Sequence, residues 1–265
     1  MNAGAIDFSI LLPAFVAGLL VTATHVPLGT QVLARGIVFI DLAIAQIAGC
    51  GVLLADRIGF EAEGIAVQIA ALAAALGGAF LLTWTERRWP DVQEAVIGVV
   101  FVLAATGGVL LLASNVHGSE HLRDLLVGQI LWVRPQQLVW AAAVYAALLA
   151  LWFGVGARLG RIGFYIVFAC AVTVSVQLVG LYLVFATLIV PPLATRALTR
   201  GRLPIAWGIG AVGYAIGLVG SAALDLPSGP AIVWTLVAVA LLVHVAVARR
   251  GVVAPVPAHS ERSAT

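Results

Sequence analysis

Residues 35–49, RGIVFIDLAIAQIAG, form an apolar run that begins at an arginine and contains two polar side chains, Asp41 and Gln46. A carboxylate well inside a membrane span costs about 2.5–3.5 kcal/mol on insertion scales, so it normally faces a cavity, a partner or an ion. The other interpretation of Asp41 is a structural ion pair with an arginine at the membrane edge. Gln46 is typical of a residue that hydrogen-bonds between helices, and the alternative is that it lines a polar path.

Outside this run, the rest of the chain is also apolar. Of its 265 residues, 62% are hydrophobic and 10% are charged, and the mean hydropathy is +1.11. A soluble domain carries about a quarter of its residues as charged side chains. The composition therefore predicts a polytopic membrane protein, an all-α bundle of membrane-spanning helices.

The apolar runs divide the chain into membrane-spanning segments of about twenty residues each. We place these segments at 8–33, 37–55, 64–84, 93–114, 138–155, 162–178, 180–195, 204–223 and 229–248. The pair between Ile162 and Thr195 is either two short spans or one span with a broken partner that hinges at Val179 and Gly180. We expect eight or nine helices in one transmembrane domain, residues 1–251, followed by a disordered tail, residues 252–265.

All fourteen basic residues are arginines, and their placement predicts the orientation of the chain. One set of connections carries Arg35, Arg87, Arg88, Arg158, Arg161, Arg196, Arg200, Arg202, Arg249 and Arg250, and the alternate set carries Arg57, Arg123 and Arg134. Nine crossings, with the N-terminus outside and the C-terminus in the cytoplasm, satisfy the positive-inside bias. No basic stripe indicates a nucleic-acid partner.

The sequence contains none of the motifs that we would expect of a membrane enzyme. It has no His-Glu-x-x-His, no Gly-x-Ser-x-Gly and no acidic pair within one predicted span. It also has no lysine for a Walker A phosphate loop, so any ATP hydrolysis must come from another subunit. Cys50 and Cys170 lie in apolar runs and are predicted to pack as small hydrophobes rather than to form a disulfide or bind metal.

Histidines provide two further candidates for metal contact. His25 lies two residues before Pro27, which leaves a backbone carbonyl without its usual donor, so the imidazole either satisfies that carbonyl or lines an ion path. The predicted outer connection contains His117, Glu120 and His121. Two histidines four residues apart on a helix, beside a carboxylate, suit zinc or another divalent ion, whereas in a loop they serve solvation.

Four further regions carry short motifs in a fixed order. The residues are 94–101, EAVIGVVF; 124–133, DLLVGQILWV; 175–180 with 188–196, SVQLVG and LIVPPLATR; and 224–229, LDLPSG. They resemble, in turn, the opening of a span, the outer segment after it, a late pair of spans and the last outer turn of the metal ABC transporter permeases. These proteins are the membrane subunits of zinc and manganese importers, and the resemblance covers residues from about 18 to 245.

The resemblance assigns a role to Asp41. Asp41 falls on the Asp of the family's Gly-Asp-Ala-Leu-Ser-His motif, in which this Asp and the His four residues later contribute to the metal path through the membrane. In this chain the position of the His is Ala45. The resemblance therefore implies Asp41 as a metal-contacting residue, without a histidine ligand. Because oxygen ligands favour a harder ion than imidazole does, manganese and iron(II) stand beside zinc as expected ions.

The same resemblance implies the function and the partners. The chain is expected to be the permease subunit of an ATP-binding-cassette importer for a divalent metal ion in the cell's inner membrane, without a permanently bound cofactor. It implies a homodimer, a separate cytoplasmic ATPase, and an extracytoplasmic metal-binding protein that delivers the ion around residues 117–134. The family's longer ATPase-docking segment is here reduced to residues 154–161, so we expect the 195–203 turn to contribute to docking. The candidate residues for this contact are Arg158, Arg161, Arg196 and Arg200.

Three alternatives remain open at this point. The first is a related siderophore or cobalamin permease. The second is an ion-coupled carrier in which Asp41 binds a proton or sodium. The third, from another class, is a non-transporting membrane scaffold or orphan subunit, which the short 154–161 turn motivates.

Overall fold

The structure is a computed structural model that describes residues 8–60, 64–112, 130–155, 160–198 and 200–249. These residues form nine α-helices and two 3-10 turns and contain no strand. The helices are α1 (Phe8–Arg35), α2 (Ile40–Arg57), α3 (Ile65–Arg88), α4 (Gln93–Leu112), α6 (Pro135–Val155), α7 (Gly160–Val179), α8 (Leu181–Ala194), α9 (Arg202–Leu224) and α10 (Ser228–Arg249), and the turns are η1 (Pro90–Val92) and η2 (Ile130–Trp132). The predicted tail, residues 252–265, lies outside the described residues.

Each of the nine predicted segments corresponds to one of these helices. In the described part of the chain, seven helices are long and apolar enough to cross a membrane, namely α1, α3, α4, α6, α7, α9 and α10. Of the other two, α2 carries the charged residues Asp41, Asp56 and Arg57. The 14 residues of α8 extend only about 21 Å, which is less than the roughly 30 Å of a hydrocarbon core. The prediction of a polytopic helix bundle is confirmed.

The break between α7 and α8 falls at the predicted position. One residue, Gly180, joins the two helices, with φ 84° and ψ 162°. Residues other than glycine rarely adopt this combination of φ and ψ angles. Since α7 has 20 residues, the pair consists of one full-length span and one short partner helix.

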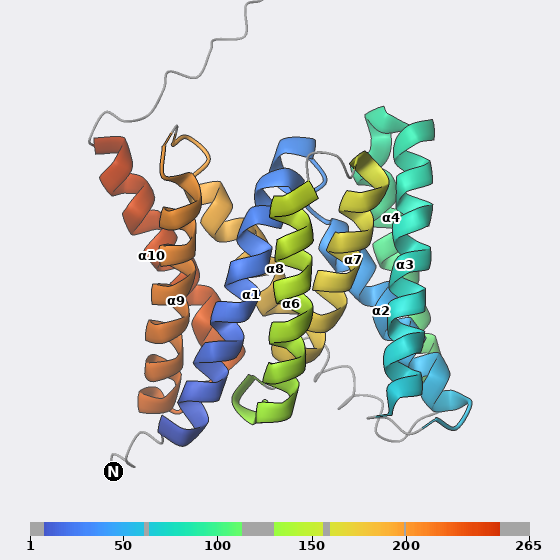
Figure 1. Cartoon of the computed structure of the whole chain (residues 1–265), viewed down its shortest axis with the longest axis horizontal. Coiled ribbons are helices and arrows are strands. Elements are labelled where there is room, and N and C mark those ends of the chain that lie inside the picture. Colours follow the sequence, from blue (N-terminus) through green and yellow to red (C-terminus); the bar gives the residue numbers. More distant parts are fainter. Residues whose placement is uncertain (1–7, 61–63, 113–129, 156–159, 199, 250–265) are drawn as a thin grey trace, which may run out of the picture.

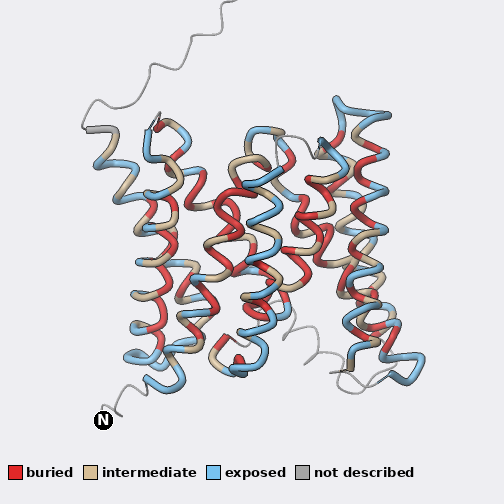
Figure 2. The backbone as a smooth tube through the Cα atoms, in the orientation of Figure 1, coloured by how far each residue is buried: buried red, intermediate tan, exposed pale blue. Residues whose placement is uncertain are grey.

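The helices are arranged as a central group flanked by two smaller groups (Figure 1). In the centre, α1 packs against α6, α7, α8 and α9. On one side α2 packs against α3 and α4, and on the other α9 packs against α10. Figure 2 shows that the buried positions concentrate between these groups, while pale blue, exposed positions follow the outer faces.

Glycines allow two of the helix pairs to approach closely. A Cβ atom added at Gly29 of α1 would lie 1.8 Å from the carbonyl oxygen of Leu188 in α8. A Cβ at Gly217 of α9 would lie 2.5 Å from the Cα of Ile232 in α10. Small residues are favoured at such contacts because lipid supplies no hydrophobic force that would push helices together, so close packing must hold them.

The two ends of the bundle differ in charge. We call the end that carries Arg35, Arg87, Arg88, Arg161, Arg196, Arg200 and Arg202 the arginine-rich end. Among the described residues, the opposite end carries Arg57 and Arg134. Exposed tryptophans lie toward both ends, with Trp84 and Trp89 at the arginine-rich end and Trp132, Trp140 and Trp234 toward the other. Tryptophan is enriched where a membrane meets water, so these positions are consistent with a bundle that spans the bilayer from end to end.

Candidate functional site

Asp41 lies in the first turn of α2, near the arginine-rich end, and is completely buried. Neither of its carboxylate oxygens has a hydrogen-bond partner among the described residues. The backbone amides of Asp41 and Leu42 lie near the carboxylate, but neither makes a hydrogen bond with it. The positive end of the helix dipole offsets part of the cost of a negative charge here. It does not replace the partner that a buried carboxylate needs.

Arg35 is the arginine nearest to Asp41 in the sequence, but it makes a different contact. Its guanidinium lies over the ring of Phe164 in α7, 4.2 Å from the ring centroid. No ion pair joins Asp41 to an arginine within the described residues. The alternative interpretation of Asp41 as half of a structural ion pair therefore finds no partner in the described part of the chain.

Glu94, in the first turn of α4, lies beside the N-terminus of α2. Its Oε1 accepts a hydrogen bond of 3.2 Å from the backbone N–H of Phe39, the residue that precedes α2. Its Oε2 is buried without a partner among the described residues. Because Phe39 lies two residues before Asp41, its hydrogen bond places Glu94 beside the first turn of α2. In the sequence, Glu94 stands out only as part of the 94–101 motif.

The neighbours of Asp41 along α2 provide little chemistry. Ala45, one turn further along the helix, is buried, and its methyl group cannot bind a metal. Gln46 is half-buried and makes no hydrogen bond with another described residue. In the described part of the chain, no three side chains of His, Cys, Asp or Glu are grouped so that they could hold a metal ion.

His25 is completely buried in α1. Its Nδ1 lies 3.1 Å from the carbonyl oxygen of Val21 and 3.0 Å from the hydroxyl of Thr24. The imidazole thus contacts the carbonyl of Val21 rather than the one that Pro27 frees at Ala23. Its Nε2 has no partner among the described residues.

Two buried hydrogen bonds between hydroxyl groups join the central helices. Tyr145 of α6 and Ser175 of α7 are 2.5 Å apart, and Thr187 of α8 and Tyr214 of α9 are 2.9 Å apart. No motif in the sequence singles out these four residues. Tyrosine, serine and threonine are common in spans, and their pairing depends on which helices pack together.

The predicted ATPase-contact residues lie at the arginine-rich end where the structure describes them. Arg196 and Arg200 are exposed in the turn between α8 and α9. Arg161 is half exposed at the start of α7, and its Nε lies 3.8 Å from Oε1 of Glu86 in α3. Arg158 lies outside the described residues, as do His117, Glu120 and His121 of the predicted outer metal contact.

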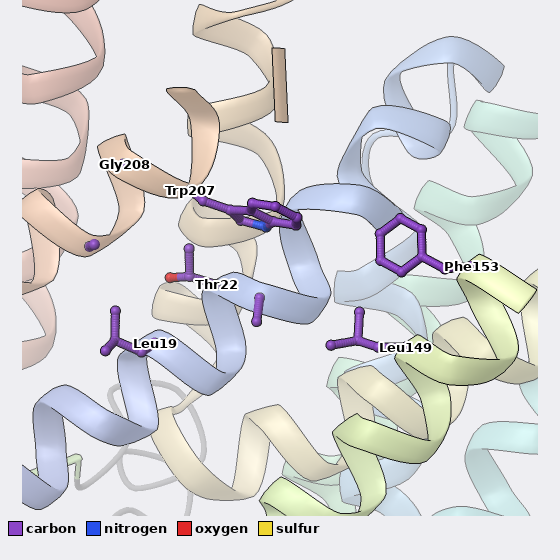
Figure 3. Close-up of a pocket in the computed structure, with 8 residues that line it drawn as sticks. Leu19, Thr22, Leu149, Phe153, Trp207 and Gly208 are labelled. Atoms are coloured by element: carbon purple, nitrogen blue, oxygen red, sulfur yellow. The ribbon is translucent and has the colours of Figure 1, made fainter. Parts of the chain in front are cut away.

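Two open grooves with apolar walls lie between helices. The first, of about 540 Å³, runs between α1, α6 and α9 and contains none of the predicted site residues. Figure 3 shows its lining side chains Leu19, Thr22, Leu149, Phe153, Trp207 and Gly208. The second groove, of about 590 Å³, follows α2 and α4. Its lining includes Phe39 and Leu42, on either side of the Asp41 turn, and Ala95, the residue after Glu94.

A multi-pass helical bundle that keeps an unpaired carboxylate inside the membrane is typical of membrane transport proteins. The comparison with known families agrees. The model of the ABC 3 transport family matches residues 7–159 and 149–248. The chain therefore belongs to this family and is the transmembrane permease of an ABC transporter.

Individual relatives are similar over most of the chain. The uncharacterized membrane protein slr2045 of Synechocystis sp. is 26% identical over 252 residues, covering 86% of this chain and 88% of the relative. The structure of PsaBC from Streptococcus pneumoniae in complex with a Fab has a TM-score of 0.73 at 21% identity, over 89% of this chain and 91% of that one. An inward-facing transporter assigned to the metal-chelate ABC type has a TM-score of 0.65 at 16% identity, over 90% and 85% of the two chains. Both solved structures have the same fold as this chain.

Proposed function

We propose that the chain is the permease subunit of an importer for a divalent metal ion, namely zinc, manganese or iron(II). In this proposal Asp41 contacts the ion as it crosses the membrane. The ion is the transported substrate, and the chain needs no permanently bound cofactor. Membership of the ABC 3 transport family supports the transport function.

The observation that carries the proposal is the state of the Asp41 carboxylate. It is 0% exposed, and both oxygens lack a partner among the described residues. An ionised carboxylate without a partner is costly to bury. A cation that passes through the bundle removes this cost while it is bound, and carboxylate oxygens are ligands for divalent ions.

The proposal includes three partners. A separate ATPase docks at the arginine-rich end, which faces the cytoplasm, and the exposed Arg196 and Arg200 are available for this contact. A second copy of the chain completes a homodimer in the inner membrane. An extracytoplasmic metal-binding protein delivers the ion to the opposite end.

The test uses the full chain purified with its ATPase, reconstituted into liposomes and supplied with the extracytoplasmic metal-binding protein. Asp41→Asn preserves the size of the side chain and removes its charge. We expect it to reduce ATP-driven uptake of Mn²⁺ and Zn²⁺ by about tenfold or more. The matched control is Asp56→Asn, which removes the same charge from an exposed position in the same helix. Uptake by Asp41→Asn at the rate of the unmodified protein would overturn the proposal.

A second candidate is the transport of a chelated metal. It is favoured by the similarity to a transporter assigned to the metal-chelate type. The same liposomes distinguish the two, because a chelate permease takes up a ferric siderophore and leaves free Mn²⁺ outside. Uptake that continues without the ATPase would instead favour an ion-coupled carrier.

A further inference from the structure

Glu94 is held against the N-terminus of α2 by a contact between two helices. The backbone N–H of Phe39 donates to its Oε1 at 3.2 Å. Phe39 lies two residues before Asp41, so this hydrogen bond fixes the Glu94 carboxylate beside the turn that carries Asp41. The groove along α2 and α4 is lined by the neighbours of both residues, Leu42 and Ala95.

The two carboxylates leave three oxygen atoms without partners among the described residues. They are Oδ1 and Oδ2 of Asp41 and Oε2 of Glu94. The Phe39 hydrogen bond holds Glu94 beside the turn that carries Asp41, and like charges repel each other most strongly where water is excluded. Among the described residues, Arg35 forms no ion pair with either carboxylate, and its guanidinium lies over Phe164. A divalent cation between the two groups would both provide the missing partner and remove the repulsion.

We propose that Glu94 is the second carboxylate ligand of the transported ion and forms with Asp41 a two-carboxylate transit site at the arginine-rich end of the bundle. This inference rests on the proposed function and adds a ligand to its site. Water completes the coordination of the ion, because the described residues offer no third His, Cys, Asp or Glu. Weak coordination suits transport, since an ion must also leave the site.

The ligand set also determines the kind of ion. Both side chains provide oxygen, and the position one turn after Asp41 is the alanine Ala45. Oxygen ligands suit Mn²⁺ better than they suit Zn²⁺, which is more often bound by nitrogen and sulfur. We expect the transit site to favour Zn²⁺ over Mn²⁺ and Fe²⁺ by a smaller factor than a site that contains histidine does.

A purely structural role of Glu94, as a cap for α2, makes a different prediction. Glu94→Gln keeps an oxygen that accepts the Phe39 N–H and removes only the charge, so a cap would remain. The matched control is Asp91→Asn, which removes the same charge from an exposed residue at the same end of the bundle.

The experiment measures Mn²⁺ binding by equilibrium dialysis of the full chain with its ATPase in nanodiscs. We expect Glu94→Gln and Asp41→Asn each to weaken Mn²⁺ binding by about 10–100-fold, and Asp91→Asn to leave it unchanged. If Glu94→Gln binds like the unmodified protein while Asp41→Asn does not, the inference about Glu94 is wrong and the proposed function stands. If Asp41→Asn also binds normally, both are wrong.

A second measurement needs no variant and covers the case in which Glu94→Gln fails to fold. Fe²⁺ bound to the unmodified complex, with ascorbate and peroxide, generates radicals that cleave the backbone near the metal. We expect cleavage near Asp41 and near Glu94, mapped by mass spectrometry and suppressed by excess Mn²⁺. Cleavage near Asp41 without cleavage near Glu94 would overturn the inference.

Discussion

Tyr145 and Ser175 share a hydrogen bond between α6 and α7, and Thr187 and Tyr214 share one between α8 and α9. These hydroxyl groups are as inaccessible as Asp41, yet each pair satisfies itself within the bundle. Other buried polar atoms, such as Nε2 of His25 and the hydroxyl of Tyr165, lack a partner among the described residues, but Asp41 is a carboxylate with neither oxygen paired. An unsatisfied group in a packed interior reduces stability unless a ligand uses it. At the scale of single residues, the combination of complete burial, an acidic group and two unpaired oxygens makes Asp41 the transport candidate.

A prediction at the same scale concerns Gly29. An alanine methyl group there would lie 1.8 Å from the Leu188 carbonyl oxygen, so α1 and α8 would have to separate. We expect Gly29→Ala to destabilise the protein by about 1–3 kcal/mol, the usual range for overpacking. The measurement is the thermal unfolding midpoint in detergent, followed by tryptophan fluorescence. The control is Gly77→Ala in α3, where the added methyl group meets no atom within 4 Å. Equal midpoints for the two variants would contradict the close α1–α8 contact.

Sequence reasoning found Asp41 because a carboxylate interrupts an apolar run, which is a local signal. It could not predict the position of the Arg35 side chain, since that depends on how α1 packs against Phe164 of α7. It could not pair Glu94 with Asp41 for the same reason. The two residues are 53 positions apart in the sequence, and only the packing of α2 against α4 brings them together.

At the scale of helices, the positions of the elements were predictable but their depth in the bundle was not. The hinge at Val179 and Gly180 was visible as a glycine at the centre of a long apolar run. In contrast, α6 and α7 have nearly equal mean hydropathies of 2.1 and 2.2 over 18-residue stretches. Yet 11% of that stretch is buried in α6 and 61% in α7. Lipid and protein interior are equally apolar, so hydropathy alone does not distinguish a peripheral helix from a central one.

The α7–α8 junction gives a prediction about an element boundary. Gly180 has φ 84° and ψ 162°, a conformation that is almost restricted to glycine. We expect Gly180→Asn to destabilise the protein by about 1–3 kcal/mol and to reduce transport, because α8 would shift relative to α7. Gly201→Asn is the control, since Gly201 has φ 69° and ψ 18°, where asparagine is tolerated. Unfolding in increasing SDS, monitored by circular dichroism, measures the difference. Similar curves for both variants would show that the junction tolerates another backbone geometry.

At the scale of the whole molecule, the uneven distribution of arginine predicts how the bundle lies in the membrane. The arginine-rich end should face the cytoplasm, since connections rich in arginine are retained there. Both native cysteines are free and half-buried, so a background of Cys50→Ala and Cys170→Ala allows single cysteines to report the side of the membrane. We expect Ile58→Cys and Leu226→Cys, at the end with few arginines, to react with a membrane-impermeant maleimide in intact cells. We expect Asp91→Cys and Arg200→Cys to react only after the membrane is permeabilised. Reaction of Asp91→Cys in intact cells would reverse the orientation and place Asp41 and Glu94 near the entrance of an import path instead of its exit.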